Sequence, residues 1–323
     1  MVITDGDRLF PVVVKRAHAP GAAVAEAAGL RWLAEARAVR VARVWGADEG
    51  WLVVRRVGAG VMDQRLGVEG RVGEGVADQR LGVEGRVGTD AVGRTGEGGA
   101  AQAGADSADQ GPGVEERGGG GSGAPPMSAS AREEAFGRDL ARMHAAGAPA
   151  FGAAPPGGLT EAWIGTAPMR NVPGESWPEW YAEHRVLPYV RLAVDAGTLD
   201  AAADAAVFER ACARIPALAG PPEPPARLHG DLWNGNVLWD AHGATLIDPA
   251  AHGGHRETDL AMLRLFGCPG LERIVAAYDE AAPLADGYRE RIGLHQLFPL
   301  LVHTVLFGRS YAGQAMAAAR SVG

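Results

Sequence analysis

Regular apolar patterns occupy both ends of the chain and leave a long middle segment without one. Residues 10–15 (Phe-Pro-Val-Val-Val-Lys) are mostly β-branched or aromatic and predict a strand, as do residues 51–57. The alanine-rich residues 22–39 between them favour a helix. The amino-terminal segment is therefore expected to run strand, helix, strand.

Residues 58–128 break this pattern. They consist mainly of glycine, acidic residues, arginine and serine, and residues 63–73 recur unchanged at residues 78–88. Solenoid repeats are longer and carry a richer apolar face, so we expect a disordered insertion rather than a repeat domain. The glycine tract at residues 118–123 lacks the Gly-Lys-Ser/Thr ending of a phosphate-binding loop.

Apolar residues return at helical spacing after the insertion. Two Ser-x-x-Glu capping boxes, starting at Ser130 and Ser176, predict helix starts, the second before a helix that reaches about residue 196. A further helix is expected over residues 201–218.

Short strands then alternate with polar turns. Strands are expected at residues 227–229, 237–239 and 244–247, with a tight turn at residues 240–243. Beyond this hairpin the chain is expected to be helical, ending in a long helix over residues 288–319.

This order predicts an α+β fold in two lobes. A small β-containing amino-terminal lobe is expected at residues 1–57 and a mostly helical lobe at residues 129–323, separated by the insertion at residues 58–128.

Composition excludes several classes of protein. A formal net charge of −8 argues against a general nucleic-acid binder, which needs a basic face. Two cysteines, Cys212 and Cys268, are too few for a disulfide framework, which favours a reducing cytoplasm. We expect neither a signal peptide nor a membrane-spanning segment, because no apolar stretch approaches eighteen residues.

The candidate chemistry lies around the hairpin. Transfer of a phosphoryl group from ATP needs a carboxylate facing the acceptor hydroxyl, oxygen ligands for Mg²⁺ and a cation on the phosphates. Asp231 and Asn236 have the Asp-x4-Asn spacing of a kinase catalytic loop, and Asp248 follows the hairpin, where a second metal-binding carboxylate would lie. The alternative is a polar turn at Asp231 and a helix cap at Asp248.

Lys15 is the only lysine in the chain. At the end of its strand it suits the phosphate-binding lysine, with Glu26 on the next helix as its ion-pair partner. Every other basic position is arginine, which suggests that a compact ammonium is needed here and not a planar guanidinium. The alternative is a solvated lysine at a strand end.

Several motifs resemble one known family. His229-Gly-Asp-Leu-Trp-Asn-Gly-Asn236, Leu246-Ile-Asp-Pro-Ala250 and Arg256-Glu-Thr-Asp-Leu-Ala-Met262 are similar to the fructosamine kinase (ketosamine-3-kinase) family. That family belongs to the aminoglycoside phosphotransferase and choline kinase group of protein-kinase-like folds. The resemblance covers nearly the whole chain except the insertion.

The resemblance implies a reaction and a set of site residues. It implies ATP- and Mg²⁺-dependent phosphorylation of a ketosamine at its 3-hydroxyl, after which the phosphate ester breaks down and frees the amine. Asp231 would be the catalytic base, Asn236 and Asp248 the metal ligands, and Trp233 would lie near the sugar.

The same resemblance raises two expectations for the amino-terminal lobe. Arg55, Arg56 and Val57 should form the hinge whose backbone meets adenine. The strand pair and glycine-rich turn that cover the ATP phosphates in the family are expected to be absent, because only three residues precede the turn at residues 4–7.

Other polar and aromatic residues carry weaker indications. His252 and His255 form a His-x2-His pair, but no third zinc ligand lies at motif spacing. Asp259 is expected to brace the catalytic loop from behind. Four aromatic residues could stack on a sugar, although core packing is their commoner role; they are Trp163, Trp177, Trp180 and Tyr181.

Two alternative functions remain at this point. One is a related phosphotransferase that acts on an aminoglycoside, choline or another sugar. The other is a catalytically impaired pseudokinase, which the short amino terminus favours and which the intact Lys15, Asp231, Asn236 and Asp248 oppose.

Overall fold

A computed structural model of the chain describes residues 1–5, 8–58, 62–63 and 125–322. The chain divides into two compact units, one made of residues 1–66 with 126–323 and one of residues 67–125. The predicted insertion, with its duplication, falls almost entirely outside the described residues and stays a prediction.

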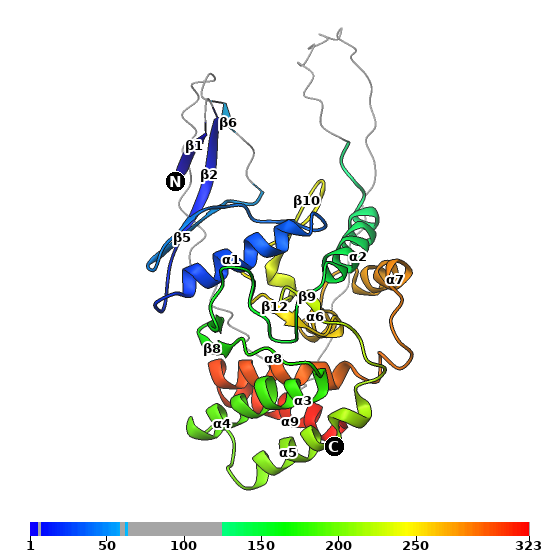
Figure 1. The fold of residues 1–323 in the computed structure, drawn as a ribbon. Coiled ribbons are helices and arrows are strands. Elements are labelled where there is room, and N and C mark those ends of the chain that lie inside the picture. Colours follow the sequence, from blue (N-terminus) through cyan, green and yellow to red (C-terminus); the bar gives the residue numbers. More distant parts are fainter. Residues whose placement is uncertain (6–7, 59–61, 64–124, 323) are drawn as a thin grey trace, which may run out of the picture. The chain divides into compact units, whose positions relative to one another are not determined.

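An antiparallel sheet forms the amino-terminal lobe (Figure 1). Its strand order is β1-β2-β5-β4, with β6 also paired to β2. The strands are β1 (Val2–Asp5), β2 (Arg8–Arg16), β4 (Val44–Ala47), β5 (Trp51–Arg55) and β6 (Met62–Asp63).

A strand pair is present at the amino terminus, where none was expected. Val2 pairs with Pro11 and Thr4 with Leu9, so that β1 and β2 form a hairpin. Three of the four residues of β1 are β-branched, and this propensity suffices for a short strand beside the longer β2. Because β2 is itself the strand that carries Lys15, this hairpin does not test the expected absence of the family's glycine-rich strand pair, which stays a prediction.

Helix α1 (Ala22–Glu35) packs its alanines against this sheet. Ala27 and Leu30 are buried with Leu52 and Val54 of β5. The helix ends earlier than expected because the chain turns into β3 (Arg40–Val41), which pairs in parallel with the distant strand β11 (Gly243–Leu246). This pairing connects the amino-terminal segment to the hairpin that precedes Asp248.

The expected hairpin is confirmed in the larger lobe. Strand β10 (Val237–Asp240) pairs antiparallel with β11 through the predicted turn. Strand β9 (Ala226–Leu228) also lies where expected, but its partner β12 (His252–Gly254) was missed, because a Gly-Gly pair carries no strand propensity. A second hairpin, of β7 (Glu161–Ile164) and β8 (Ala167–Arg170), was likewise not foreseen.

Helices make up most of this lobe, and α2 and α7 lie side by side in Figure 1. They are α2 (Ala129–Ala145), α3 (Trp177–Tyr181), α4 (Leu187–Asp195), α5 (Ala203–Leu218), α6 (Glu257–Leu265), α7 (Leu271–Ala281), α8 (Ile292–Phe307) and α9 (Arg309–Val322). The chain thus has a two-lobed α+β fold. In the residues described, no helix is both long and apolar enough to cross a membrane.

Three further helix boundaries differ from the prediction. Helix α2 is capped by Ser128, whose Oγ accepts from Ala131 N at 3.2 Å, and not by Ser130. A π-helical segment (Ala182–Val186) separates α3 from α4. The expected final helix is two helices, because Gly308 adopts a positive φ of 77° between them.

Candidate active site

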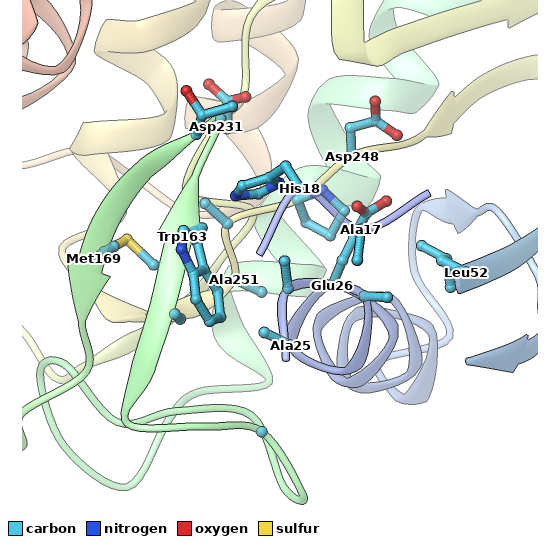
Figure 2. A pocket seen from close by; sticks show the side chains of 18 of the residues that line it. Ala17, His18, Ala25, Glu26, Leu52, Trp163, Met169, Asp231, Asp248 and Ala251 are labelled. Carbon is cyan, nitrogen blue, oxygen red and sulfur yellow. The ribbon is translucent and has the colours of Figure 1, made fainter. Parts of the chain in front are cut away.

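A cavity of about 370 Å³ brings the predicted catalytic residues together. Figure 2 shows Glu26 and Leu52 on one side of it, Trp163 and Met169 on the opposite side, and Asp231 at the top of the view. Lys15, Trp233, Asn236 and Asp248 also line it. These residues come from β2, α1, β5, the β7–β8 hairpin and the two segments that flank β10–β11.

Lys15 connects α1 with the segment that follows β11. Its Nζ donates to Glu26 Oε1 at 2.8 Å and Oε2 at 3.0 Å, and lies 3.0 Å from Asp248 Oδ1. Burial acts to lower the pKa of Lys15, but the carboxylates of Asp248 and Glu26 outweigh it and raise the pKa. Lys15 is therefore a charged ammonium, and the predicted ion pair with Glu26 is present.

Asp231 is a half-buried carboxyl group with an unusual acidity. Burial raises its pKa to about 7, opposed by a hydrogen bond from Asn236 and reinforced by the charges of Asp248 and Asp259. Asn236 Nδ2 donates to Asp231 Oδ2 at 3.0 Å. A carboxyl group that changes charge near neutral pH is suited to accept a proton during a reaction.

The catalytic loop, residues 229–236, is fixed from behind by α6. Asp259 accepts hydrogen bonds from His229 N at 2.7 Å and Gly230 N at 3.0 Å, as the expected bracing role requires. Burial alone would raise the pKa of Asp259, but hydrogen bonds and nearby imidazoles lower it, so it is a carboxylate. Gly230 has a φ of 80°, and a side chain there would clash with the carbonyl oxygen of Ala250.

The two histidines around this loop are buried structural groups. His229 Nε2 lies 2.9 Å from Ile247 O, an acceptor, so Nε2 carries the proton and Nδ1 accepts from Asp231 N at 3.3 Å. His144, on α2, lies 3.2 Å from Asp259 through Nε2 and 2.8 Å from Tyr278 Oη through Nδ1. Both rings hold the loop and neither lines the cavity, among the residues that the structure describes.

Asp248 has a strained backbone and an exposed carboxylate. It is one of two non-glycine residues with positive φ in the described chain, at 53°, a conformation that concentrates at functional sites. Asn236 Nδ2 donates to Asp231 O at 2.8 Å and approaches Asp248 O at 3.4 Å. Among the residues that the structure describes, Asn236 Oδ1 accepts no hydrogen bond. A carboxylate and an amide oxygen are the ligands that Mg²⁺ prefers, so these side chains fit the ion.

The predicted substrate residue lies at the cavity, whereas the predicted hinge residues do not line it. Trp233 lines the cavity and meets Phe266 edge to face, with ring centroids 6.3 Å apart. Arg55, Arg56 and Val57 are not among the described residues that line the cavity. Arg55 is the last residue of β5 and the other two follow it, and Arg56 N donates to Pro11 O at 2.9 Å. Their contact with adenine stays a prediction.

Sequence reasoning underestimated the β7–β8 hairpin. Trp163 and Met169 line the cavity, as does Asn171, which follows β8. The Trp-Ile-Gly run at residues 163–165 was a signal, but the sequence contained no sign that the hairpin would face Asp231. Of the other aromatic candidates, Trp177, Trp180 and Tyr181 are buried in the core, which was their expected commoner role.

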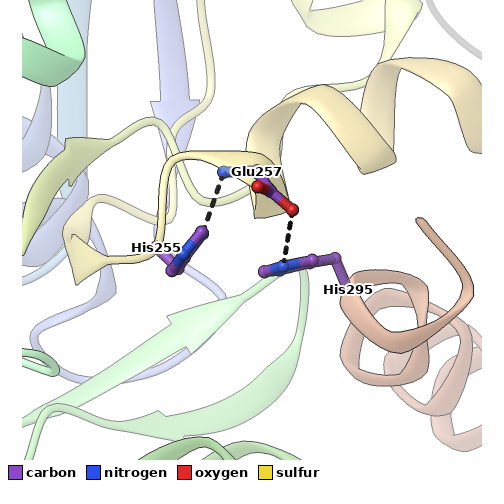
Figure 3. Close-up of side chains that lie close together, drawn as sticks. All are labelled: His255, Glu257 and His295. Carbon is purple, nitrogen blue, oxygen red and sulfur yellow. Dashed lines mark hydrogen bonds and ion pairs between the residues drawn. The ribbon is translucent and has the colours of Figure 1, made fainter. Parts of the chain in front are cut away.

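A second cluster of titratable side chains contains one of the two histidines considered for zinc. His255, Glu257 and His295 lie within 4.8 Å of one another (Figure 3), whereas His252 Nδ1 bonds Ala250 O at 2.8 Å. Glu257 is already neutralised by Arg291, whose Nη2 and Nε donate at 2.6 and 2.9 Å. The group is therefore an ion-pair network.

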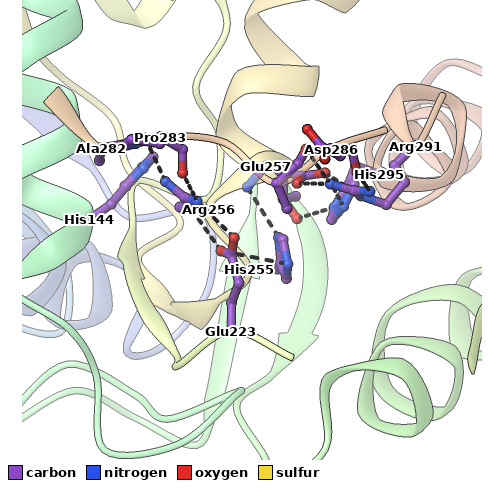
Figure 4. A network of polar contacts seen from close by, with 12 residues as sticks. His144, Glu223, His255, Arg256, Glu257, Ala282, Pro283, Asp286, Arg291 and His295 are labelled. Atoms are coloured by element: carbon purple, nitrogen blue, oxygen red, sulfur yellow. Dashed lines mark hydrogen bonds and ion pairs between the residues drawn. The ribbon is translucent and has the colours of Figure 1, made fainter. Parts of the chain in front are cut away.

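The network extends to a second arginine (Figure 4). Arg256 forms a bidentate pair with Glu223, at 2.7 Å to each oxygen, and donates to Ala282 O at 2.9 Å. Burial acts to raise the pKa of Glu257, but hydrogen bonds from His295 and Arg291 lower it to about 2. Through the contacts of Arg256 with Ala282 and of Glu257 with Arg291, the network joins the starts of α6 and α8 to the end of α7.

Comparison with known proteins identifies a family for most of the chain. The model of the fructosamine kinase family matches residues 125–322, a range that includes Asp231, Asn236 and Asp248. The chain belongs to the fructosamine kinase family.

Individual relatives give the same result. The chain is 36% identical over 154 residues to a ketosamine-3-kinase of Mus musculus, covering 47% of this chain and 48% of that protein. It is 35% identical over 187 residues to a chloroplastic protein-ribulosamine 3-kinase of Arabidopsis thaliana, covering 56% and 54%. The chain therefore spans about half the length of these two curated relatives.

A solved structure matches over a longer range. The crystal structure of a candidate fructosamine-3-kinase from Thermobifida fusca is similar with a TM-score of 0.71 and 39% identity. The match covers 98% of this chain and 88% of that one. The fold of this fructosamine kinase family member is therefore a kinase-like phosphotransferase fold.

Proposed function

We propose that this chain transfers the γ-phosphoryl group of ATP to the 3-hydroxyl of a ketosamine. The observation that supports it most is the geometry around Asp231, which lines the same cavity as Lys15 and accepts a hydrogen bond from Asn236 Nδ2 at 3.0 Å. The family match to residues 125–322 supports the choice of acceptor.

In this reaction the oxygen of the acceptor hydroxyl bonds to the γ-phosphorus while the bond from that phosphorus to the β–γ bridging oxygen breaks and ADP leaves. Asp231 receives the proton that the hydroxyl loses. Asn236 keeps the carboxylate oriented through the hydrogen bond to Oδ2. Lys15 approaches the phosphates as a point charge, held in place by Glu26. A bound Mg²⁺, held by Asp248 and Asn236, would neutralise charge on the phosphates.

The proposal extends to partners and setting. The substrate is a small ketosamine or a glycated amine, and the phosphate ester formed would break down and release the amine. We also propose a cytoplasmic enzyme that uses ATP and Mg²⁺ and binds no nucleic acid. The acidic net charge of −8 supports the last point.

A transfer assay with three ketosamines tests the proposal. Purified chain, ATP and Mg²⁺ are incubated with ribulosamine, fructosamine or erythrulosamine, and an aminoglycoside and choline serve as alternative acceptors. We expect phosphate transfer to at least one ketosamine and none to the alternatives. Transfer only to an alternative acceptor would identify a different phosphotransferase, and no transfer at all would indicate a pseudokinase.

A further inference from the structure

Arg185 is a buried cation without a counterion. Its side chain, in the π-helical segment, is 1% exposed, and in the part of the chain that the structure describes no carboxylate lies within ion-pair distance. Burial lowers its pKa to about 10. A buried charge without an opposite charge nearby lowers the free energy of unfolding. The position of Arg185 therefore indicates a role other than stabilising the fold.

Aromatic rings and neutral oxygens surround this guanidinium. Its carbon lies 4.5 Å above the ring of Trp180 and 5.5 Å from that of Phe298. Nη1 donates to the carbonyl oxygens of Arg170, at 2.8 Å, and His184, at 3.1 Å. Its remaining hydrogen bond, from Nη2, goes to the side chain of Asn171 at 3.2 Å.

This contact decides which way the Asn171 amide faces. A guanidinium has only donors, so the atom that it meets must be the amide oxygen, Oδ1. The NH₂ group then faces the other way, where its one acceptor among the described residues is Leu159 O at a long 3.4 Å. Asn171 is itself 3% exposed, and it lines the same cavity as Asp231. A residue that lines the cavity thus carries an amide donor with a single, long hydrogen bond among the described residues.

We propose that Asn171 donates a hydrogen bond to an oxygen of the acceptor substrate next to the reacting hydroxyl, and that Arg185 is a positioning residue that fixes this amide. The inference rests on the proposed function and adds a recognition contact on the acceptor side of the cavity. The carboxylate of Asp231 accepts the hydrogen of the reacting hydroxyl. A hydrogen-bond donor such as the Asn171 amide is suited to bind a neighbouring oxygen of the same substrate.

Asn171→Asp separates this role from a structural one. The carboxylate has nearly the same shape and gives Arg185 the counterion that it lacks, so the melting temperature should stay equal or rise. The NH₂ donor is lost, so KM for the ketosamine should rise about tenfold or more, while KM for ATP stays within about twofold. Arg170→Met, in a neighbouring exposed pair with Glu161, is the matched control and should change neither.

Arg185→Lys tests the positioning role. An ammonium cannot reproduce the planar donor pattern, so KM for the ketosamine should rise several-fold with little change in kcat. If Arg185 acts through Asn171, this effect should disappear when Arg185→Lys is made in the Asn171→Ala background. Equal effects in both backgrounds would show that Arg185 only supports the fold.

The results distinguish this inference from the proposed function. If the wild-type chain phosphorylates a ketosamine and Asn171→Asp leaves KM for it unchanged, the recognition contact is wrong and the function stands. A proportional rise in KM for both substrates would also overturn the contact. A wild-type chain that phosphorylates no ketosamine would overturn both.

Discussion

Lys15 Nζ lies 3.0 Å from Asp248 Oδ1, so the only lysine of the chain contacts the carboxylate proposed to bind the metal. Each partner is held by its own element, Lys15 at the end of β2 and Asp248 after β11. A shift of β2 relative to the hairpin would separate them. An intact contact between Lys15 and Asp248 therefore indicates that β2 and the β10–β11 hairpin are correctly placed relative to each other.

Replacement of this lysine should impair ATP use. We expect Lys15→Arg to lower kcat/KM for ATP by about tenfold or more, because the planar guanidinium cannot occupy the site of a compact ammonium between two carboxylates. Steady-state kinetics with varied ATP would measure it. Arg31→Lys, exposed on α1, is the control. An unaltered rate and ATP affinity in Lys15→Arg would remove Lys15 from the proposed site.

Replacement of the proposed base should stop chemistry and spare nucleotide binding. Asp231→Asn removes the group that accepts the proton, and such groups contribute roughly 10²–10⁴-fold to rates. We expect turnover to fall by that factor, while ATP affinity by calorimetry stays near that of the wild type. Near-normal turnover would mean that Asp231 is not the base.

The buried pair of Arg291 and Glu257 should be important for stability. Arg291→Met leaves the Glu257 carboxylate buried without its partner, and we expect a loss of about 3–5 kcal/mol in the free energy of unfolding. Arg170→Met breaks the exposed pair with Glu161 and should cost at most about 1 kcal/mol. Urea unfolding of both variants compares them directly, and similar losses would contradict this account of the network.

Acid should destabilise the fold through its buried imidazoles. Burial lowers the pKa of His252 to about 3 and that of His255 well below its ordinary value. The unfolded chain therefore binds these protons more readily, so the stability is complete above about pH 6.5 and falls as the pH drops towards 3.

Unfolding free energies measured between pH 7 and pH 4 would test this. We expect His252→Asn to be less stable at pH 7 but to lose less stability on acidification than the wild type. His242→Asn, at an exposed position, should keep the wild-type slope. If His252→Asn kept that slope too, the acid sensitivity would come from other groups.

The sequence predicted those parts of the site that depend on short spacing. Asp231 and Asn236 lie five residues apart within one loop, and the hairpin before Asp248 follows from a local turn, so both could be recognised directly. The pair of Lys15 and Glu26 followed from strand and helix propensity in the same way. Local chemistry was sufficient for these residues.

The remaining parts depend on contacts between distant segments. The amide of Asn171 is oriented by Arg185, which lies in a π-helical segment that no propensity indicates. His255 meets His295 forty positions later, where no motif spacing exists. Ser128 was missed as a helix cap because Ser130 fitted the capping-box pattern better. Packing, and not local preference, decides such contacts.

The parallel pairing of β3 with β11 has a consequence for biosynthesis. The guanidinium of Arg40 donates hydrogen bonds to Ala244 O and to the carboxylate of Asp240. Both partners lie about two hundred residues later in the chain, so they are synthesised long after Arg40. A nascent chain therefore exposes β3 as an unpaired edge until most of the protein has been made, and such edges favour aggregation. The yield of correctly folded protein should therefore depend on synthesis of the carboxyl-terminal half.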